Sequence, residues 1–293
     1  MRLRLRDREL ELRPGEPLLM GIVNATPDSF SDVRGPKALD ELVARARDLA
    51  AGGATLIDVG GESGRSDTEA VPVEEEIERV TPLIERLAGE GLIVSVDTWR
   101  SPVARAALDA GAAMVNDVSG LQDPAIADAC AETGAALVVT HTRSAPKTKV
   151  FPEYADVVAD VAELLRERAD EARRRGVTEE QLVYDPGIDI AKSPAESVDV
   201  LRRLSELRGL GRPLLVAVSR KDFVGALTER PPSARLGGSL AALGFSVDGG
   251  AHILRMHDVA DASDYLRVRA ALRGEVDVPR DLHLDVALRR EPG

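Results

Sequence analysis

Polar and ionisable side chains follow a series of short apolar runs along the chain, and these residues are the best suited to do chemistry. At least one stands at the end of each of eight apolar runs. In chain order they are Asn24, Asp58, Asp97, Asn116 with Asp117, His141, Asp185, Ser219 with Arg220 and Lys221, and Arg255 with His257. The set contains both signs of charge. If the ends meet, carboxylates and cations together could hold a polar heterocycle and an anionic group.

Each of these residues, taken alone, has a simpler interpretation. A polar residue directly after a strand often caps a helix or forms a turn, and Asp58 and Asp117 fit that description. His252 begins the last apolar run and His283 lies near the C-terminus, so both are interpreted as structural or exposed. One cysteine and four scattered histidines give no zinc spacing, and no nucleophile elbow or Walker loop is present. A site is therefore favoured only if the strand ends converge.

The apolar runs alternate with helical patterns from residue 18 onward. The runs are 18–23, 54–59, 92–96, 113–118, 136–139, 181–184, 213–218 and 251–256. Between them, apolar residues recur at helical spacing, as in Leu39, Leu42, Val43 and Ala46. The longest helix is expected over residues 154–175, ended by Gly176. A further helix is expected over residues 123–133, where Cys130 is interpreted as a small core residue.

Eight strand–helix units in roughly 250 residues are the size of a (β/α)8 TIM barrel, although a doubly wound open sheet is the rival. Continuous apolar strands indicate burial on both faces and hence a parallel sheet. In such a barrel the active site lies at the carboxyl ends of the strands, where the polar residues fall. We expect three segments: an N-terminal β-hairpin over 1–17, the barrel over 18–275, and a tail over 276–293. The tail is either a short strand or a frayed end.

Composition excludes several classes of protein. The net charge is −12 without a basic stripe, so we expect no nucleic-acid partner. No apolar run approaches the ~18 residues of a membrane span, and no apolar signal-peptide core is present, so no membrane partner is expected. Cys130 is the only cysteine, which excludes an intrachain disulfide and favours a reducing, cytoplasmic location.

Two glycine-rich stretches are candidates for ligand contact. Gly60 and Gly61 follow the second run, and their lack of a side chain would let the backbone approach a ligand. Gly237 and Gly238 open a helix after the seventh run, a usual place for anion binding in barrels, where Arg235 and Ser239 could assist. Arg235 alone is more simply a surface charge.

Several of these stretches resemble the signatures of dihydropteroate synthases. Residues 20–32 (MGIVNATPDSFSD) resemble the first signature and residues 57–63 (IDVGGES) the second. Residues 94–98, 115–120, 185–187, 218–221 and 255–259 match the remaining motifs in family order. The resemblance spans about residues 18–272, and the motifs are specific together although weak singly.

The resemblance implies a TIM-barrel transferase of folate biosynthesis. It condenses 6-hydroxymethyl-7,8-dihydropterin pyrophosphate with p-aminobenzoate, giving 7,8-dihydropteroate and pyrophosphate. The resemblance also implies that the pterin is hydrogen-bonded by Asp97, Asn116, Asp185 and Lys221. The catalytic candidates among these are Asp97, Asp185 and Lys221. It implies that the pyrophosphate is held by Asn24, Arg255 and His257, with Mg2+ near Asn24 and Asp32. The p-aminobenzoate site is implied to involve Phe30, Arg65, Ser219 and Lys221, and the enzyme to be a homodimer.

The chain departs from the family pattern near the second-substrate mouth. After the second strand it reads Ser-Gly-Arg-Ser-Asp over residues 63–67, where the family has Ser-Thr-Arg-Pro-Gly. Val33 and Arg34 replace two glycines, and the stretch 140–149 is rich in basic residues. Residues 188–192 replace a run containing Gly and Phe. These changes bear on p-aminobenzoate turnover and sulfonamide sensitivity more than on pterin binding.

Two alternatives to a synthase stay open at this point. One is a pterin-binding paralogue with lost or altered second-substrate specificity, which the changed loops favour and the complete pyrophosphate set opposes. The other is a pterin-dependent methyltransferase acting with a corrinoid protein. The Ser-Arg-Lys and Arg-x-His motifs argue against it, since methyl transfer releases no anion.

Overall fold

The computed structural model describes residues 1–13, 15–26, 36–62 and 69–289. Two antiparallel strands come first, β1 (Arg2–Leu5) and β2 (Arg8–Glu11). The parallel strands are β3 (Leu18–Asn24), β4 (Ala54–Gly60), β5 (Ile93–Asp97), β6 (Met114–Asp117), β7 (Ala136–Thr140), β8 (Leu182–Asp185), β9 (Leu215–Ala217) and β10 (Ile253–Met256).

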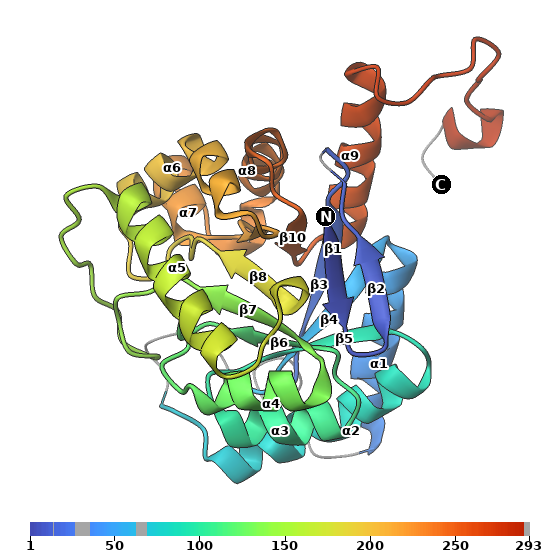
Figure 1. Ribbon diagram of the computed structural model, residues 1–293. Helices are drawn as coiled ribbons and strands as arrows, with labels where there is room; N and C mark the ends of the chain where they lie inside the picture. The colour runs from blue at the N-terminus through green and yellow to red at the C-terminus, as the bar shows by residue number, and fades with distance from the viewer. Residues whose placement is uncertain (14, 27–35, 63–68, 290–293) are drawn as a thin grey trace.

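Helices follow the parallel strands and surround them (Figure 1). They are α1 (Pro36–Ala51), α2 (Val73–Gly89), α3 (Ser101–Asp109), α4 (Ala125–Thr133), α5 (Val157–Arg174), α6 (Pro194–Arg202), α7 (Asp222–Thr228), α8 (Leu236–Gly249) and α9 (Val259–Leu272). Short 3-10 helices lie at Glu179–Gln181, Leu204–Leu210, Pro232–Ala234 and Val286–Arg289. No helix of the described ranges is long and apolar enough to cross a membrane.

The eight parallel strands form a barrel, as predicted. Their order is β8-β7-β6-β5-β4-β3-β10-β9. A parallel bridge between Tyr184 and Leu214, with the Tyr184 N–H donating to Pro213 O at 2.9 Å, joins the two ends of this sheet. The open-sheet rival is therefore wrong. The main core lies between the barrel and its helices and contains Cys130, which is fully buried as expected.

The N-terminal hairpin closes the bottom of the barrel. Leu3, Leu5 and Leu12 are buried in one cluster with apolar side chains from the barrel interior. The Arg6 guanidinium donates to Leu108 O at 2.7 Å and to Ala112 O at 3.2 Å, which ties the hairpin turn to the last turn of α3 and the loop that follows it. Apolar packing therefore fills the end of the barrel opposite the polar strand ends.

Several element boundaries differ from the sequence-based expectation, among them those of α5, β9 and β8. The helix expected over 154–175 begins only at Val157, because Asp156 is its N-cap and accepts from Val158 N at 2.9 Å and Ala159 N at 3.1 Å. The run 213–218 forms a strand only at Leu215–Ala217, and the run 181–184 begins with a 3-10 turn.

The tail extends away from the barrel beyond α9 and contains a 3-10 helix, Val286–Arg289, so the short-strand alternative is wrong (Figure 1). Leu282, Leu284 and Leu288 are exposed. An alternating pattern forms a strand only where one face is buried, and these side chains have no such face.

Candidate active site

The strand register separates an apolar lower layer of the barrel interior from a polar upper layer. Side chains two residues apart on a strand point the same way. The lower and upper members are Leu56 and Asp58, Met114 and Asn116, Val183 and Asp185, and Ile253 and Arg255. Parallel pairing places Gly60 beside Asp97, and Asp97 beside Asn116. The interior therefore changes from apolar to polar within one step along each strand, toward the end that the motifs mark.

Arg255 links two carboxylates across the barrel. Its Nε lies 2.6 Å from Asp58 Oδ2 and its Nη2 lies 2.7 Å from Asp97 Oδ2. Asn116 Nδ2 donates to the same Asp58 oxygen at 3.0 Å. Asp58 is fully buried and caps no helix, so its interpretation as a cap or turn former is wrong. The physical reason is its position: it faces the barrel axis, where Arg255 requires a counter-charge.

The contact between Asp97 and Arg255 opposes the effect of burial on the pKa of both side chains. Burial raises the pKa of the Asp97 carboxyl to about 7, although Arg255 opposes the shift. The side chain of Asp97 keeps 24% of its surface exposed, which leaves it reachable from the barrel mouth. Burial alone would lower the pKa of Arg255, but Asp58 and Asp97 raise it overall. The protonation state of Asp97 near neutral pH is therefore sensitive to a charge that develops beside it.

Asp185 and Lys221 stand on the other side of the barrel. Gly187 N donates to Asp185 Oδ1 at 2.7 Å, which orients the carboxylate. Burial raises the pKa of Asp185, and the Gly187 N–H and the charge of Lys221 counteract the rise. Lys221 is half-buried and is the N-cap residue of α7. The charge of Lys221 also lowers the pKa of Asp97, so this lysine favours the ionised form of both carboxylates.

Ser219 and His257 form a pair at the ends of β9 and β10. Ser219 Oγ accepts from His257 N at 3.1 Å and lies 3.0 Å from His257 Nδ1. Burial, together with the charge of Arg255, lowers the pKa of His257 to about 4. The ring is therefore neutral at pH 7 and can donate or accept a hydrogen bond without adding charge.

One glycine in each glycine-rich stretch, Gly61 and Gly238, permits close packing. A Cβ at Gly61 would lie 2.7 Å from Val80 on α2, so this glycine permits a close strand–helix contact. Arg235 Nη1 donates to Arg220 O at 2.9 Å and to Lys221 O at 3.1 Å, and Ser239 Oγ accepts from Arg220 N. These bonds hold the segment that carries Lys221, and the suggestion that Arg235 and Ser239 assist an anion stays a prediction.

Asp117, in contrast, is the turn former that the sequence predicts. It accepts hydrogen bonds from Ser119 N at 2.8 Å and from Ser119 Oγ at 2.6 Å. His252 also has the structural role expected of it, because its Nδ1 accepts from Leu214 N at 3.2 Å. His283 lies exposed in the tail. These residues take no part in the polar centre of the barrel.

Four buried polar atoms of the barrel interior have no hydrogen-bond partner within the described part of the chain: Asp58 Oδ1, Ser95 Oγ, Asn116 Oδ1 and Thr140 Oγ1. Leaving such an atom unpaired costs about 1–3 kcal/mol. A flat heterocycle that carries both donors and acceptors would satisfy them. Ser95 and Thr140 were missed from the sequence, although their period-two spacing from Asp97 and from Val138 was a usable signal.

Asn24 ends β3 with its side chain exposed at the barrel mouth. Its Oδ1 lies 3.8 Å from the position that a Cβ on Gly60 would take, close to Asp97. The other residues assigned to the mouth, Phe30, Asp32 and Arg65, lie outside the described residues. Within the described ranges no group of three or more His, Cys, Asp and Glu could hold a metal.

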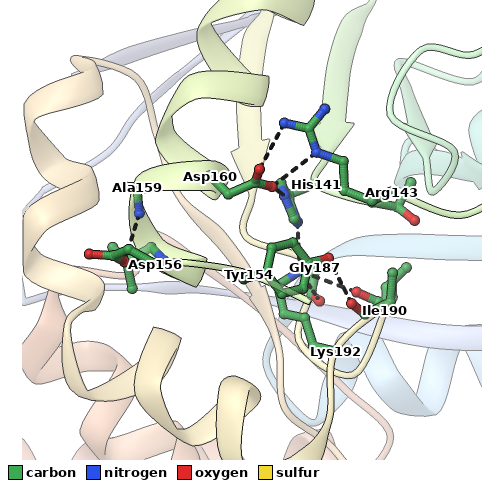
Figure 2. Close-up of polar contacts among 12 residues, drawn as sticks. His141, Arg143, Tyr154, Asp156, Ala159, Asp160, Gly187, Ile190 and Lys192 are labelled. Carbon is green, nitrogen blue, oxygen red and sulfur yellow. Dashed lines mark hydrogen bonds and ion pairs between the residues drawn. The ribbon is translucent and has the colours of Figure 1, made fainter. Parts of the chain in front are cut away.

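His141 was grouped with the strand-end residues, but its ring takes part in a separate network. It is fully buried, with Nδ1 2.7 Å from Lys192 Nζ and Nε2 2.7 Å from Asp160 Oδ2 (Figure 2). Lys192 was not singled out from the sequence as a site residue. An Asp-Ile-Ala-Lys stretch gives no local signal that the lysine is buried, since lysine is almost always exposed.

Comparison with known proteins identifies the family. A family profile described as pterin binding enzyme matches residues 20–257. The dihydropteroate synthase of Synechocystis sp. is 41% identical over 258 residues, which make up 87% of this chain and 89% of that protein. The structure of Xanthomonas albilineans dihydropteroate synthase with 4-aminobenzoic acid has a TM-score of 0.86 and 44% identity, over 95% of this chain and 99% of that chain. The structure of that enzyme in complex with 7,8-dihydropteroate has a TM-score of 0.84 and 43% identity, over 95% of this chain and all of that chain.

The chain therefore belongs to the pterin-binding enzyme family. The prediction of a dihydropteroate synthase, a transferase of folate biosynthesis, is confirmed by these relatives, which are similar over most of the chain.

Proposed function

We propose that the polar upper layer of the barrel binds 6-hydroxymethyl-7,8-dihydropterin pyrophosphate and joins it to p-aminobenzoate. The observation that carries this proposal is the set of unpaired buried atoms beside Asp97 and Asp185. A dihydropterin ring has amino, amide and ring-nitrogen groups that would pair with them. In this proposal Asp97, Asn116, Asp185 and Lys221 hold the ring, and relatives with p-aminobenzoate and dihydropteroate support the choice of substrates.

The chemistry follows from charge. Departure of pyrophosphate breaks a C–O bond and leaves a cation delocalised into the pterin. The two carboxylates Asp97 and Asp185 stabilise this cation in a partly dry pocket, where electrostatic effects are strong. The pKa of Asp97, raised to about 7 by burial, falls as positive charge develops nearby, which favours its ionised form. The amine nitrogen of p-aminobenzoate then forms a C–N bond with the cation and loses one proton to solvent, and no strong base is required because the amine is already a nucleophile.

The leaving pyrophosphate is assigned to Asn24, Arg255 and His257. The bonds from Arg255 to Asp58 and Asp97 use Nε–H and one N–H of Nη2, out of five donors on a guanidinium. Its remaining donors can face the anion. His257 is neutral at pH 7, since burial lowers its pKa to about 4, so it contributes a hydrogen bond and Arg255 contributes the charge.

Mg2+ is proposed as the cofactor at the barrel mouth. Mg2+ prefers oxygen ligands, keeps several waters, and is commonly bound by one or two carboxylates plus substrate phosphates. The amide oxygen of Asn24 fits this donor chemistry, with Asp32 as the second candidate, and no all-protein cage is needed. When bound, the ion would neutralise charge on the departing pyrophosphate. Removal of Mg2+ by EDTA should reduce turnover, with recovery on addition of excess Mg2+.

A homodimer is proposed, with the outer face of α7, α8 and α9 as its contact. Leu227, Phe245, Val268 and Leu272 are 52–83% exposed on these three consecutive helices. Large exposed apolar side chains on neighbouring helices favour protein–protein contact. Sedimentation should give a dimer for the parent and a monomer for Phe245→Asp with Leu272→Asp. A monomeric parent at micromolar concentration would contradict the proposal.

A cytoplasmic location is proposed as well, supported by the single, buried cysteine.

The decisive experiment follows pyrophosphate release and dihydropteroate formation by chromatography, with and without p-aminobenzoate. Amine-dependent dihydropteroate formation is expected, and it should be lost in Asp97→Asn. Asp264→Asn, the same substitution at an exposed site on α9, is the matched control. Tight pterin binding without dihydropteroate at any amine concentration would instead establish the paralogue with altered second-substrate specificity.

A further inference from the structure

A buried lysine outside the proposed substrate contacts anchors the segment that follows β8. Lys192 is 1% exposed and lies just before α6. Its Nζ lies 2.7 Å from His141 Nδ1, 3.0 Å from Gly187 O and 3.2 Å from Ile190 O. All three donors of the ammonium are therefore used. Burying an ammonium is costly unless all of its donors are hydrogen-bonded, so packing alone does not explain a lysine at this position.

The contact with His141 continues to the protein surface (Figure 2). Because His141 Nδ1 accepts from Lys192, its Nε2 carries the proton and donates to Asp160 Oδ2 at 2.7 Å. Burial, with a smaller effect of Lys192, lowers the pKa of His141 to about 4, which keeps the ring neutral. Arg143 holds Asp160 with two bonds of 3.0 and 2.9 Å. Hydrogen bonds thus link four side chains in a row, and each side chain orients the next: Arg143, Asp160, His141 and Lys192.

The inner end of this chain reaches Asp185. His141 N donates to Asp185 O at 2.8 Å, and Gly187 N donates to Asp185 Oδ1 at 2.7 Å. Gly187 has φ +68, and a Cβ there would lie 2.1 Å from His141 O and 3.3 Å from Lys192 Nζ. The turn that orients the Asp185 carboxylate is thus held against β7, and the Lys192 ammonium bonds its carbonyl oxygen.

The middle of the same segment reaches Lys221. Asp189 Oδ2 accepts from Phe223 N at 3.2 Å, and its Oδ1 accepts from Ser197 Oγ at 3.0 Å. Phe223 lies two residues after Lys221, in the first turn of α7. Asp189 has φ 62, a conformation that is uncommon outside glycine and that the surrounding contacts maintain. The segment 185–192 therefore connects the backbone that carries Asp185 with the backbone that carries Lys221.

We propose that Lys192 is a positioning residue for the reaction: through the segment 185–192 it sets the places of the Asp185 carboxylate and the Lys221 ammonium. The proposal rests on the roles given above to Asp185 and Lys221. Lys192 does not touch the substrate. His141, Asp160 and Arg143 act through Lys192 by fixing the acceptor that its ammonium meets.

The main test is Lys192→Met, which keeps an unbranched side chain, one heavy atom shorter than lysine, and removes the three hydrogen bonds of the ammonium. Loss of the anchor should lower kcat/KM for the pterin pyrophosphate on the order of 100-fold, as misplacement of catalytic groups by about 1 Å does. Lys37→Met, the same substitution at an exposed lysine on α1, is the matched control and should retain parental kinetics. A folded Lys192→Met variant with kcat/KM within threefold of the parent overturns the proposal.

A second variant covers the case in which Lys192→Met does not fold. Asp160→Asn alters the network at a side chain that is 24% exposed, and it leaves all three hydrogen bonds of the Lys192 ammonium in place. It should reduce kcat/KM by about tenfold, since one uncharged hydrogen bond replaces the charge-assisted one. Unchanged kinetics in this variant would overturn the proposal as well.

The pH profile separates positioning from a purely structural role. The charged and titratable groups facing the ammonium are His141 just after β7, Asp160 on α5, Asp185 on β8, Glu196 on α6, and Lys221. Burial lowers the pKa of Lys192 to about 7, so the ammonium is lost as pH rises through that value. The parent should show an alkaline fall in kcat/KM that Lys192→Met lacks. An identical alkaline limb in both would leave only a structural role and refute the proposal.

Failure of the proposed function is distinguished from failure of this inference by a binding measurement. The dissociation constant of a dihydropterin for the parent and for Lys192→Met is obtained from the fluorescence of the pterin, without turnover. If the parent forms no dihydropteroate, the function fails. A weakened pterin affinity in Lys192→Met would still support positioning of Asp185, and equal affinities would refute it.

Discussion

Replacing Asp97 by Asn should stabilise the protein at alkaline pH while removing its activity. Burial raises the pKa of Asp97 to about 7 from an ordinary value of 3.8. A carboxyl whose pKa is higher in the folded protein binds more protons when folded. The stability that it contributes is therefore fully present below pH 4 and is lost as pH rises through about 7. Asn resembles the protonated carboxyl and carries no such dependence.

The size of the effect follows from the pKa of Asp97. At pH 5, about two pH units below that pKa, the protonated carboxyl contributes about 3 kcal/mol relative to the unfolded chain, at about 1.4 kcal/mol per unit. At pH 8 this contribution is gone. Relative to the parent, Asp97→Asn should therefore gain about 3 kcal/mol of unfolding free energy between pH 5 and pH 8.

Urea unfolding of the parent and Asp97→Asn at both pH values measures this difference directly. Groups that titrate equally in both proteins cancel in the comparison. Asp264→Asn, at an exposed site, should show no such change with pH. A pH-dependent difference for Asp97→Asn smaller than about 0.5 kcal/mol, the usual scatter of a surface substitution, would refute the argument that burial raises the pKa of this carboxyl.

Three further substitutions test other parts of the structure. Arg255→Met leaves the carboxylates of Asp58 and Asp97 buried without their cation, and should lower the unfolding free energy at pH 8 by about 3–5 kcal/mol in urea titrations; a loss below about 1 kcal/mol would contradict the pairing. Gly187→Ala places a Cβ 2.1 Å from a backbone oxygen, so kcat/KM for the pterin substrate should fall on the order of 100-fold, whereas Gly209→Ala, with open space around its Cβ, should match the parent in the same assay. Leu3→Ala leaves a cavity where the hairpin packs against the bottom of the barrel, so the free energy of unfolding in urea should fall by about 2–5 kcal/mol while kcat is retained. An equally stable variant would show that the hairpin does not close the barrel.

The strands and the order of the site residues were accessible from the sequence because both depend on local patterns. Each apolar run needed only its own composition, and each motif only its own neighbours. Boundaries were less accessible: α5 begins after the Asp156 cap, which the apolar pattern alone could not place. The tail alternates in sequence, yet its described residues Leu282, Leu284 and Leu288 are exposed.

Interpretation of single polar residues was weakest where their partners are distant in sequence. Asp58 has the local pattern of a turn former, but its partners Asn116 and Arg255 lie 58 and 197 residues away. The local sequence around Lys192 is that of a surface lysine, and its burial depends on His141, which is 51 residues distant. Neither contact leaves a trace in the local sequence.

The sequence by itself determined the eight strand–helix units, the end of the barrel that carries chemistry, and the types of side chain available there. Periodicity and turn residues act over a few positions, so one chain segment is enough to specify them. Only the tertiary structure decided which charges pair across the barrel, which polar atoms stay without a partner in its interior, and which lysine lies buried behind Asp185. Those properties depend on distances between segments far apart in the chain, because burial and charge pairing are set by what surrounds a group in space.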